Sequence, residues 1–292
     1  MLAPAALQPD SEEGPKNMFA TVLIGTDLSA ASDRLIACLP GLHGLGTREV
    51  ILVHALGLRH LEEMKHALAP LVEPRVAAQR EAIERLGFRA SLEIAPGIPA
   101  AEIHRVARER AAALILLGSG SSGARELLLG SVTVQVLHRT DIPVLVCHCP
   151  VGGDAAAAHP GVDLRAHLLH ATDFSAPEDR ALGFVEQFAR AGAKRVTLVQ
   201  VQHREPADRG RLDHLRTRLL LEGADEVSVE VPTGVPGEEI VRIATEQGAS
   251  LVVMGTTGRG SASAVYLGSV SHRVVRHSPV PVLLVPPHRG DS

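Results

Sequence analysis

The hydrophobic positions of this chain form short, continuously apolar runs that alternate with longer stretches of helical spacing. In the second half these runs read HLLHAT, RVTLVQV, EVSVEVP, ASLVVMG and VPVLLV, and a helical stretch follows each of the first four. Apolar runs that do not alternate with polar residues are typical of parallel strands covered by helices on both faces. The pattern therefore predicts an α/β fold with a doubly wound, roughly five-stranded parallel sheet.

The same order of elements occurs twice along the chain. Five blocks of the first half recur in the second, among them LGSVTVQVLHRTDIPVLVC, which corresponds to LGSVSHRVVRHSPVPVLLV. Asp27 and Asp173 are 146 positions apart, whereas Gly118 and Gly255 are 137 apart, so the second copy is about nine residues shorter. The first copy has its extra length in a helical segment around His60–Gly87. We therefore expect two tandem domains that arose by duplication.

Local signals set the expected helix starts and domain limits. Ser175 and Glu178 form a capping box around Pro177, and we expect further helices through Arg211–Glu222, from Pro236 and from Ser269. The stretch 150–164 is rich in Ala, Gly and Pro and predicts a linker between domains at 18–149 and 165–287. Residues 1–17 lack the basic start of a signal peptide and read as a flexible extension, with a short tail at 288–292.

Composition narrows the class of function. Of the 292 residues, 45% are hydrophobic and only 2% aromatic, so Leu, Val, Ile and Ala must fill the core. The net charge of −4, without a basic run, argues against nucleic acid as a partner. No apolar run approaches the length of a membrane span. Three cysteines do not form a disulfide framework, which favours a reducing cytoplasm.

The candidate chemistry lies where the strands of the second half end. Ligands of open parallel sheets bind beyond the carboxyl ends of the strands. Gly255 and Gly258 follow the fourth strand and permit a tight turn, and Gly268–Ser269 opens a helix ten residues after Gly258. A helix N-terminus offers free amides and a partial positive charge, which suit a phosphate group. The stretch from 255 to 270 therefore predicts a phosphate-binding loop.

This loop reads G-x2-G-x9-G-S, and with it the chain resembles the universal stress proteins in their tandem form, over both copies. ATP-binding members of that family carry G-x2-G-x9-G-[ST]. The resemblance implies an adenine nucleotide α-hydrolase-like fold, ATP with Mg²⁺, and an intramolecular pseudo-dimer whose last strands pair, with a homodimer of chains as a further expectation. It implies adenine contacts for Thr172, Val201 and Met254, a ribose contact for Asp173, and phosphate contacts around Gly255, Gly258, Gly268, Ser269 and Val270.

The first copy departs from this pattern. Its loop GSGSSGARELLLGSV spans 12 positions from Gly118 to Gly130 where the second copy has 13, and Ser121 stands in place of Gly258. Ala55 replaces Val201, while Asp27, Gly130 and Ser131 are retained. We therefore expect the first copy to form the phosphate cradle poorly, and about one adenine nucleotide per chain, in the second copy.

Two other motifs suggest functions that their sequence context does not favour. GSGSSG matches a dinucleotide fingerprint, but it follows the fourth strand of its copy rather than the first, and no carboxylate ends a following strand. Cys147, His148 and Cys149 suggest a metal site, yet adjacent strand residues point to alternate faces, which favours a buried strand.

The sequence predicts an ATP-binding, non-catalytic regulatory protein of the stress response. Two alternatives stay open. One is a slow ATPase or an enzyme that phosphorylates itself on Ser261 or Ser263. The other is a nucleotide-free scaffold that binds a metal, a lipid or a protein.

Overall fold

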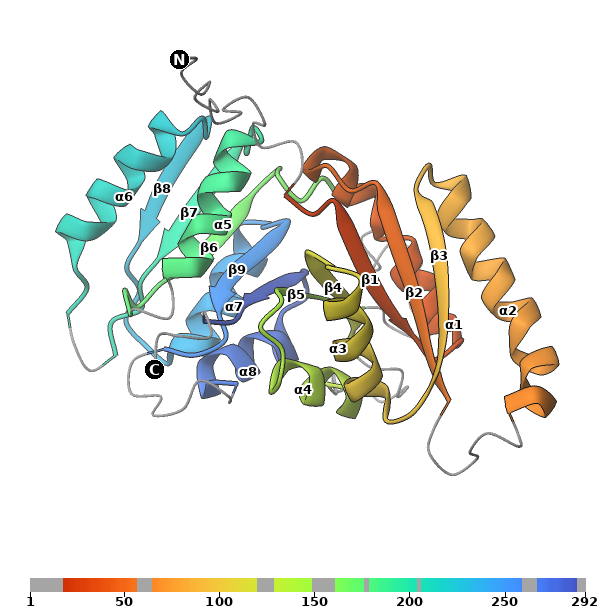
Figure 1. The fold of residues 1–292 in the computed structure, drawn as a ribbon. Helices are drawn as coiled ribbons and strands as arrows, with labels where there is room; N and C mark the ends of the chain where they lie inside the picture. Colours follow the sequence, from red (N-terminus) through yellow and green to blue (C-terminus); the bar gives the residue numbers. More distant parts are fainter. Residues whose placement is uncertain are drawn as a thin grey trace, which may run out of the picture.

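A single ten-stranded sheet runs through the whole molecule (Figure 1). The computed structural model describes residues 18–56, 65–119, 129–148, 161–175, 179–203, 206–258 and 267–287. The strand order is β3-β2-β1-β4-β5-β10-β9-β6-β7-β8, with five strands from each half. Strands pair in parallel within each half, whereas β5 and β10 pair antiparallel where the halves meet. The predicted fold class, two tandem doubly wound α/β units, is confirmed.

The elements of the two halves follow one another in the same order. Those of the first half are β1 (Thr21–Thr26), α1 (Ala30–Ile36), the 3-10 helix η1 (Leu39–Leu45), β2 (Glu49–Leu56), α2 (Lys65–Arg85), β3 (Arg89–Pro96), α3 (Pro99–Glu109), β4 (Leu114–Gly118), α4 (Ser131–Leu137) and β5 (Val144–Cys147). Those of the second are β6 (Leu168–Ala171), α5 (Asp179–Arg190), β7 (Arg195–Val199), α6 (Arg209–Leu221), β8 (Glu226–Glu230), α7 (Pro236–Glu246), β9 (Leu251–Gly255), α8 (Ser269–His277) and β10 (Val282–Val285).

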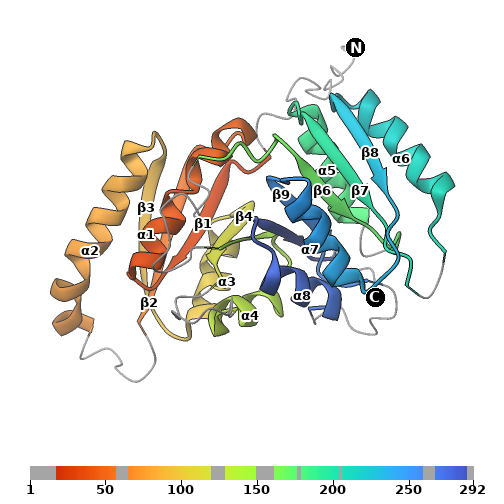
Figure 2. The same cartoon turned by 180° about the vertical axis from the view of Figure 1, so that it is seen from behind.

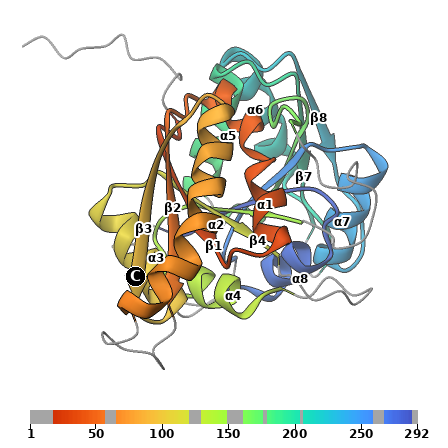
Figure 3. The same cartoon turned by 90° about the vertical axis from the view of Figure 1, so that its right-hand side faces the viewer.

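The expected helix starts at Pro236 and Ser269 are confirmed. Pro236 occupies the first turn of α7, where a missing amide hydrogen costs nothing. The extra length of the first copy is the 21-residue helix α2, which lies beside the edge strand β3 in Figure 3. The proposed capping box falls partly on Pro177 and Glu178, which lie outside the described residues.

Helices cover both faces of the sheet, and each face has its own hydrophobic core. Helices α1, α2, α5 and α6 pack on one face, and α3, α4, α7 and α8 pack on the other (Figures 1 and 2). Because neighbouring strand residues point to opposite faces, Leu168 belongs to the first core and Leu169 to the second. The strand ends of each half are therefore flanked by helices on both faces.

The two halves join through the sheet and through a small aromatic cluster. Leu283 of β10 lies opposite Leu145 of β5, so the predicted pairing of the last strands is confirmed. Phe19 of the first half stacks on Phe184 of α5 with ring centroids 5.7 Å apart, and its ring meets the edge of Phe188 at 6.4 Å. Three of the five phenylalanines thus lie at this junction.

Within the described ranges, no helix combines the length and hydrophobicity needed to cross a bilayer.

Candidate functional site

A cavity of about 380 Å³ opens at the strand ends of the second half, on the face covered by α7 and α8. Three separate segments form it: the turn after β6, the end of β7, and the stretch from β9 to the start of α8. All nine candidate residues line this one cavity, namely Thr172, Asp173, Val201, Met254, Gly255, Gly258, Gly268, Ser269 and Val270. The fold therefore brings together residues that are almost 100 positions apart in sequence.

The start of α8 faces this cavity without a side-chain cap. Gly268 is the N-cap residue and, having no side chain, it makes no capping hydrogen bond to the first turn. Within the helix, His272 N donates to Gly268 O at 2.8 Å, so the amides of residues 269–271 precede the first intrahelical bond. Uncapped amides at a helix start, together with the helix dipole, form a site for a phosphate group.

A hydrogen bond holds the start of α8 against the end of β9. The Ser271 hydroxyl donates to Gly255 O at 2.9 Å. In the first half, the Thr133 hydroxyl donates in the same way to Gly118 O at 2.8 Å. These two residues were not predicted from the sequence. The signal that could have identified them is a hydroxyl side chain three residues after the helix-opening glycine in both copies.

The turn after β6 places Asp173 directly against the glycine loop. Thr172 Oγ1 accepts a hydrogen bond from Phe174 N at 3.0 Å, and Asp173 Oδ1 accepts one from Ser175 N at 2.9 Å. A Cβ atom built on Gly258 would lie 2.5 Å from Asp173 Oδ2. Real Cβ atoms do not approach an oxygen so closely, so a larger residue at 258 would have to displace the Asp173 carboxylate from this position.

The other end of the cavity is apolar. Val201 and Met254 lie there as expected, and Val199, Pro236 and Ile240 complete the walls. The side chains of α7 were missed because their part in the cavity depends on how α7 packs, which no local motif shows. An apolar slot beside a group of amides suits a ligand with a flat ring at one end and an anion at the other.

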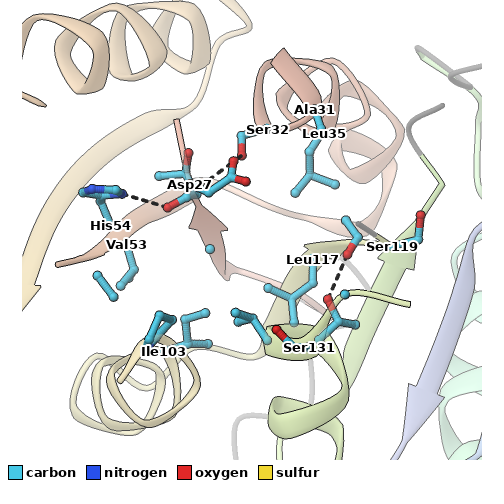
Figure 4. A pocket seen from close by; sticks show the side chains of 18 residues that line it. Asp27, Ala31, Ser32, Leu35, Val53, His54, Ile103, Leu117, Ser119 and Ser131 are labelled. Carbon is cyan, nitrogen blue, oxygen red and sulfur yellow. Dashed lines mark hydrogen bonds between the residues drawn. The ribbon is translucent and has the colours of Figure 1, made fainter. Parts of the chain in front are cut away.

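The first half has a corresponding cavity of about 350 Å³ (Figure 4). Asp27, Ala55, Gly130 and Ser131 line it, each at the place expected from the repeat. Figure 4 shows Asp27 hydrogen bonded to Ser32, on the other side of the cavity from Ile103. The shortened loop, including Ser121, lies outside the described residues.

Asp27 is already bound within its own turn. Its Oδ1 accepts hydrogen bonds from Ser29 N at 3.0 Å and from the Ser32 hydroxyl at 2.6 Å. Burial raises the pKa of Asp27, but the hydrogen bonds from Ser29 and Ser32 outweigh it and hold the pKa below its ordinary value. In the second copy Glu178, which cannot donate as a carboxylate, stands in place of Ser32. The two carboxylates thus differ in their neighbours.

Comparison with known proteins agrees with this duplicated architecture. The family model described as "Universal stress protein family" matches residues 18–148 and again 165–286. The chain belongs to the universal stress protein family. A universal stress protein of Mycolicibacterium smegmatis is 28% identical over 294 residues, which cover 91% of this chain and 97% of that protein.

A solved structure of the family shares the fold over nearly the whole chain. The crystal structure of a universal stress protein from Archaeoglobus fulgidus matches with a TM-score of 0.77 and 27% identity, over 91% of this chain and 98% of that one. A universal stress protein of known structure in complex with cAMP is 26% identical, with a TM-score of 0.36, and covers 42% of this chain and 98% of its own.

The cysteine–histidine motif of this universal stress protein serves packing. Cys147 is buried in β5, and the His148 Nε2 atom lies 2.9 Å from Val275 O of α8. Cys149 lies outside the described residues. Among the residues that the structure describes, no three His, Cys, Asp or Glu side chains are grouped so as to hold a metal ion.

Proposed function

We propose that this universal stress protein is an ATP-binding regulatory protein of the cytoplasmic stress response, whose second half holds one adenine nucleotide with Mg²⁺. The observation that supports it best is that all nine candidate residues line one cavity. That cavity has uncapped helix amides at one end and apolar walls at the other. A second support is Gly258, where a Cβ atom would lie 2.5 Å from Asp173 Oδ2, so the glycine lets the loop pack directly against this carboxylate.

Each part of the cavity has a role in this proposal. The first amides of α8 and the Ser269 hydroxyl donate to phosphate oxygens, and Asp173 accepts from a ribose hydroxyl. Val201 and Met254 pack on the adenine ring. Hydrogen bonds to charged groups contribute about 1.5–3 kcal/mol each. A few of them therefore supply the roughly −8 kcal/mol of a micromolar complex.

ATP acts here as a conformational ligand. A nucleotide that binds one conformation of the loop more tightly than another shifts the protein toward that conformation. Among the described lining residues, Asp173 is the one with an acidic or basic side chain, and its Oδ1 is hydrogen bonded to Ser175 N. A regulatory role needs only nucleotide binding, so it does not require a general base beside the phosphates.

The proposal is tested by calorimetric titration of Mg-ATP into the wild type and two matched variants. Gly268→Asp places a carboxylate at the start of α8, and Gly130→Asp does the same at α4 in the first half. Asp is a favourable N-cap residue and Gly268 has φ −62°, but a Cβ atom there would lie 3.2 Å from Thr256 O, so circular dichroism and thermal unfolding of each variant precede the titration. We expect Gly268→Asp to weaken ATP binding at least 100-fold and Gly130→Asp to leave it within twofold. Equal effects of both substitutions, or of neither, would contradict the proposal.

A release assay for ADP on the same proteins tests the enzymatic alternative. We expect no turnover above the rate of uncatalysed hydrolysis. Steady ADP release by the wild type that Gly268→Asp abolishes would instead establish an ATPase.

A further inference from the structure

A second cleft of the C-terminal half lies on the opposite face of the sheet from the nucleotide cavity, between α5 and α6. Its volume is about 310 Å³. His170 of β6 lines it, while the next residue along the strand, Ala171, lines the nucleotide cavity on the other face. Leu182 of α5 and Leu215 of α6 form the apolar part of its walls. Thr172 lines both spaces, and it is the one residue of the proposed nucleotide site that also lines this cleft.

The first half fills the equivalent space with one of its own side chains. Gln79 of α2 is only 4% exposed, and its Oε1 accepts a hydrogen bond from the Thr26 hydroxyl at 2.8 Å. Its Nε2 donates to Asp33 Oδ1 at 2.7 Å. The amide thus closes the gap between the end of β1 and the start of α1.

The second half lacks this amide. Buried residues of α2 (Val76, Gln79, Ile83) and of α6 (Leu212, Leu215, Leu219) have the same spacing, so Leu215 occupies the position of Gln79. The shorter apolar side chain of Leu215 does not bridge the two elements, and a cleft remains. The duplication therefore provides a filled and an open version of the same space.

His170 gives the floor of the cleft a hydrogen-bond acceptor. Its side chain is 1% exposed, and its Nδ1 lies 3.1 Å from Val253 O. Because a carbonyl only accepts, this contact requires the proton on Nδ1. Burial lowers the pKa of His170 to about 4, so the ring is neutral at pH 7 and Nε2 is left as an acceptor. The first half has Ile24 at this position.

Two arginines line the rim of the cleft. Arg211 and Arg218 lie one above the other along α6, with His214 between them. The Arg211 guanidinium rests over the Phe174 ring at 4.2 Å from its centroid, which fixes its place.

Three carboxylates lie close to these arginines. Asp179 lies in the first turn of α5 and lines the cleft. Arg218 also pairs with the buried Glu186, at 2.7 Å between Nη2 and Oε1. Asp208, the N-cap of α6, accepts a hydrogen bond from Arg211 N at 3.0 Å, while the Arg211 guanidinium lines the cleft beside Phe174.

We propose that this cleft binds a small organic anion that also carries a hydroxyl group. Its carboxylate or phosphate group pairs with Arg211 and Arg218, and its hydroxyl donates to Nε2 of His170. Carboxylate and phosphate share this chemistry, because both accept hydrogen bonds from a guanidinium group. The two are distinguished by experiment.

The test is a calorimetric titration of the full chain with four probes: 3-phosphoglycerate, glycerate, glycerol 3-phosphate and inorganic phosphate. Leu215→Gln restores the residue of the first half, and Arg211→Gln removes the rim charge. Arg216→Gln is the control, because Arg216 lies exposed on the same helix and pairs with Asp213 instead.

We expect saturable binding of at least one hydroxyl-bearing probe, weakened at least tenfold by Leu215→Gln and by Arg211→Gln and unchanged within twofold by Arg216→Gln. If glycerate binds more tightly than glycerol 3-phosphate, the site is a carboxylate site. If glycerol 3-phosphate binds more tightly, it is a phosphate site. The ¹⁵N shift of His170 Nε2 should move on binding. Absence of binding by all four probes, or equal affinity in all variants, would overturn the proposal.

The anion site of α8 requires a separate control, because it also attracts phosphate. Binding that persists in Gly268→Asp belongs to the α5–α6 cleft. Binding that Gly268→Asp abolishes and Arg211→Gln leaves unchanged would place the probe at α8 and overturn the proposal, while agreeing with an anion site in the nucleotide cavity.

Discussion

At the scale of single residues, the contact between Gly258 and Asp173 shows how closely the two loops fit. The space for a Cβ atom on Gly258 is already taken by Asp173 Oδ2, at 2.5 Å. Asp173 is held from the other side by Ser175 N. Any side chain at 258 must therefore displace either the carboxylate or the loop.

Gly258→Ala is expected to weaken ATP binding about tenfold, or roughly 1.4 kcal/mol, because the new methyl group displaces the Asp173 carboxylate. Calorimetric titration measures the effect. Gly183→Ala is the matched control, since a Cβ there meets nothing within 4 Å. Unchanged affinity in Gly258→Ala would show that the carboxylate position does not matter for the ligand.

His170 is expected to make the stability of the protein depend on pH. Burial lowers its pKa to about 4 in the folded state, so the unfolded chain takes up a proton at higher pH than the folded one. Its contribution is complete above the ordinary pKa of about 6.5 and is lost as the pH falls from there toward 4. At pH 5 this loss is about 2 kcal/mol of unfolding free energy.

Urea unfolding of the wild type and of His170→Ile at pH 7.5 and pH 5 measures this contribution. Isoleucine is chosen because the first half has Ile24 at this position. The variant should lose about 2 kcal/mol less than the wild type between the two pH values. The pKa of His167 is also lowered, by burial and by Arg195, so some dependence on pH remains in the variant. Identical losses would assign the effect to groups other than His170.

At the scale of elements, the start of α8 depends on the end of β9. Ser271 and Thr133 make the same bond to a glycine carbonyl in the two halves, so the joint is structural in both. In the second half, this joint also fixes the position of the α8 amides that we propose to bind the phosphates. Removal of either hydroxyl should therefore affect stability alike but ligand binding differently.

Ser271→Ala and Thr133→Val are each expected to lower the free energy of unfolding by about 1–2 kcal/mol, because a buried carbonyl loses its donor. Only Ser271→Ala should weaken ATP binding, by about threefold to tenfold. Chemical denaturation and calorimetry of the two variants give both values. An equal loss of affinity in both would mean that the joint acts through general stability.

The elements were predictable where their signals are local. Pro236 and Gly268–Ser269 mark the starts of α7 and α8 because a missing amide hydrogen and a glycine N-cap are properties of single positions. The α5–α6 cleft was not predicted, because it arises from Leu215 standing where α2 has Gln79, and only packing shows this. The assignment of nucleotide contacts to Thr172, Asp173 and their neighbours stays a prediction.

At the scale of the whole molecule, a continuous sheet and one aromatic cluster join the two halves. Arg180 of α5 adds one hydrogen bond across this junction, donating to Asp141 O at 2.6 Å, and a second within its own half, to Pro286 O at 3.0 Å. The repeated sequence predicted two units. The partners of Phe19 could not be predicted, since they depend on how the units are placed.

Phe188→Ala is expected to lower the free energy of unfolding by about 3–5 kcal/mol and to split the thermal transition into two, because the aromatic contact between the halves is lost. Phe88→Ala is the control, because Phe88 is also buried but stacks on His43 within the first half. Scanning calorimetry distinguishes the two. A single transition in both variants would contradict the role of the cluster in coupling the halves.

The central claim is that the amides at the start of α8 hold an adenine nucleotide and that the first half has largely lost this ability. Mass spectrometry of the ligand released from freshly purified protein, with its molar ratio to the chain, tests it most directly. We predict about one adenine nucleotide per chain in the wild type and in Gly130→Asp, and none in Gly268→Asp. Two nucleotides per chain, or a ligand that Gly268→Asp retains and Gly130→Asp loses, would contradict the account.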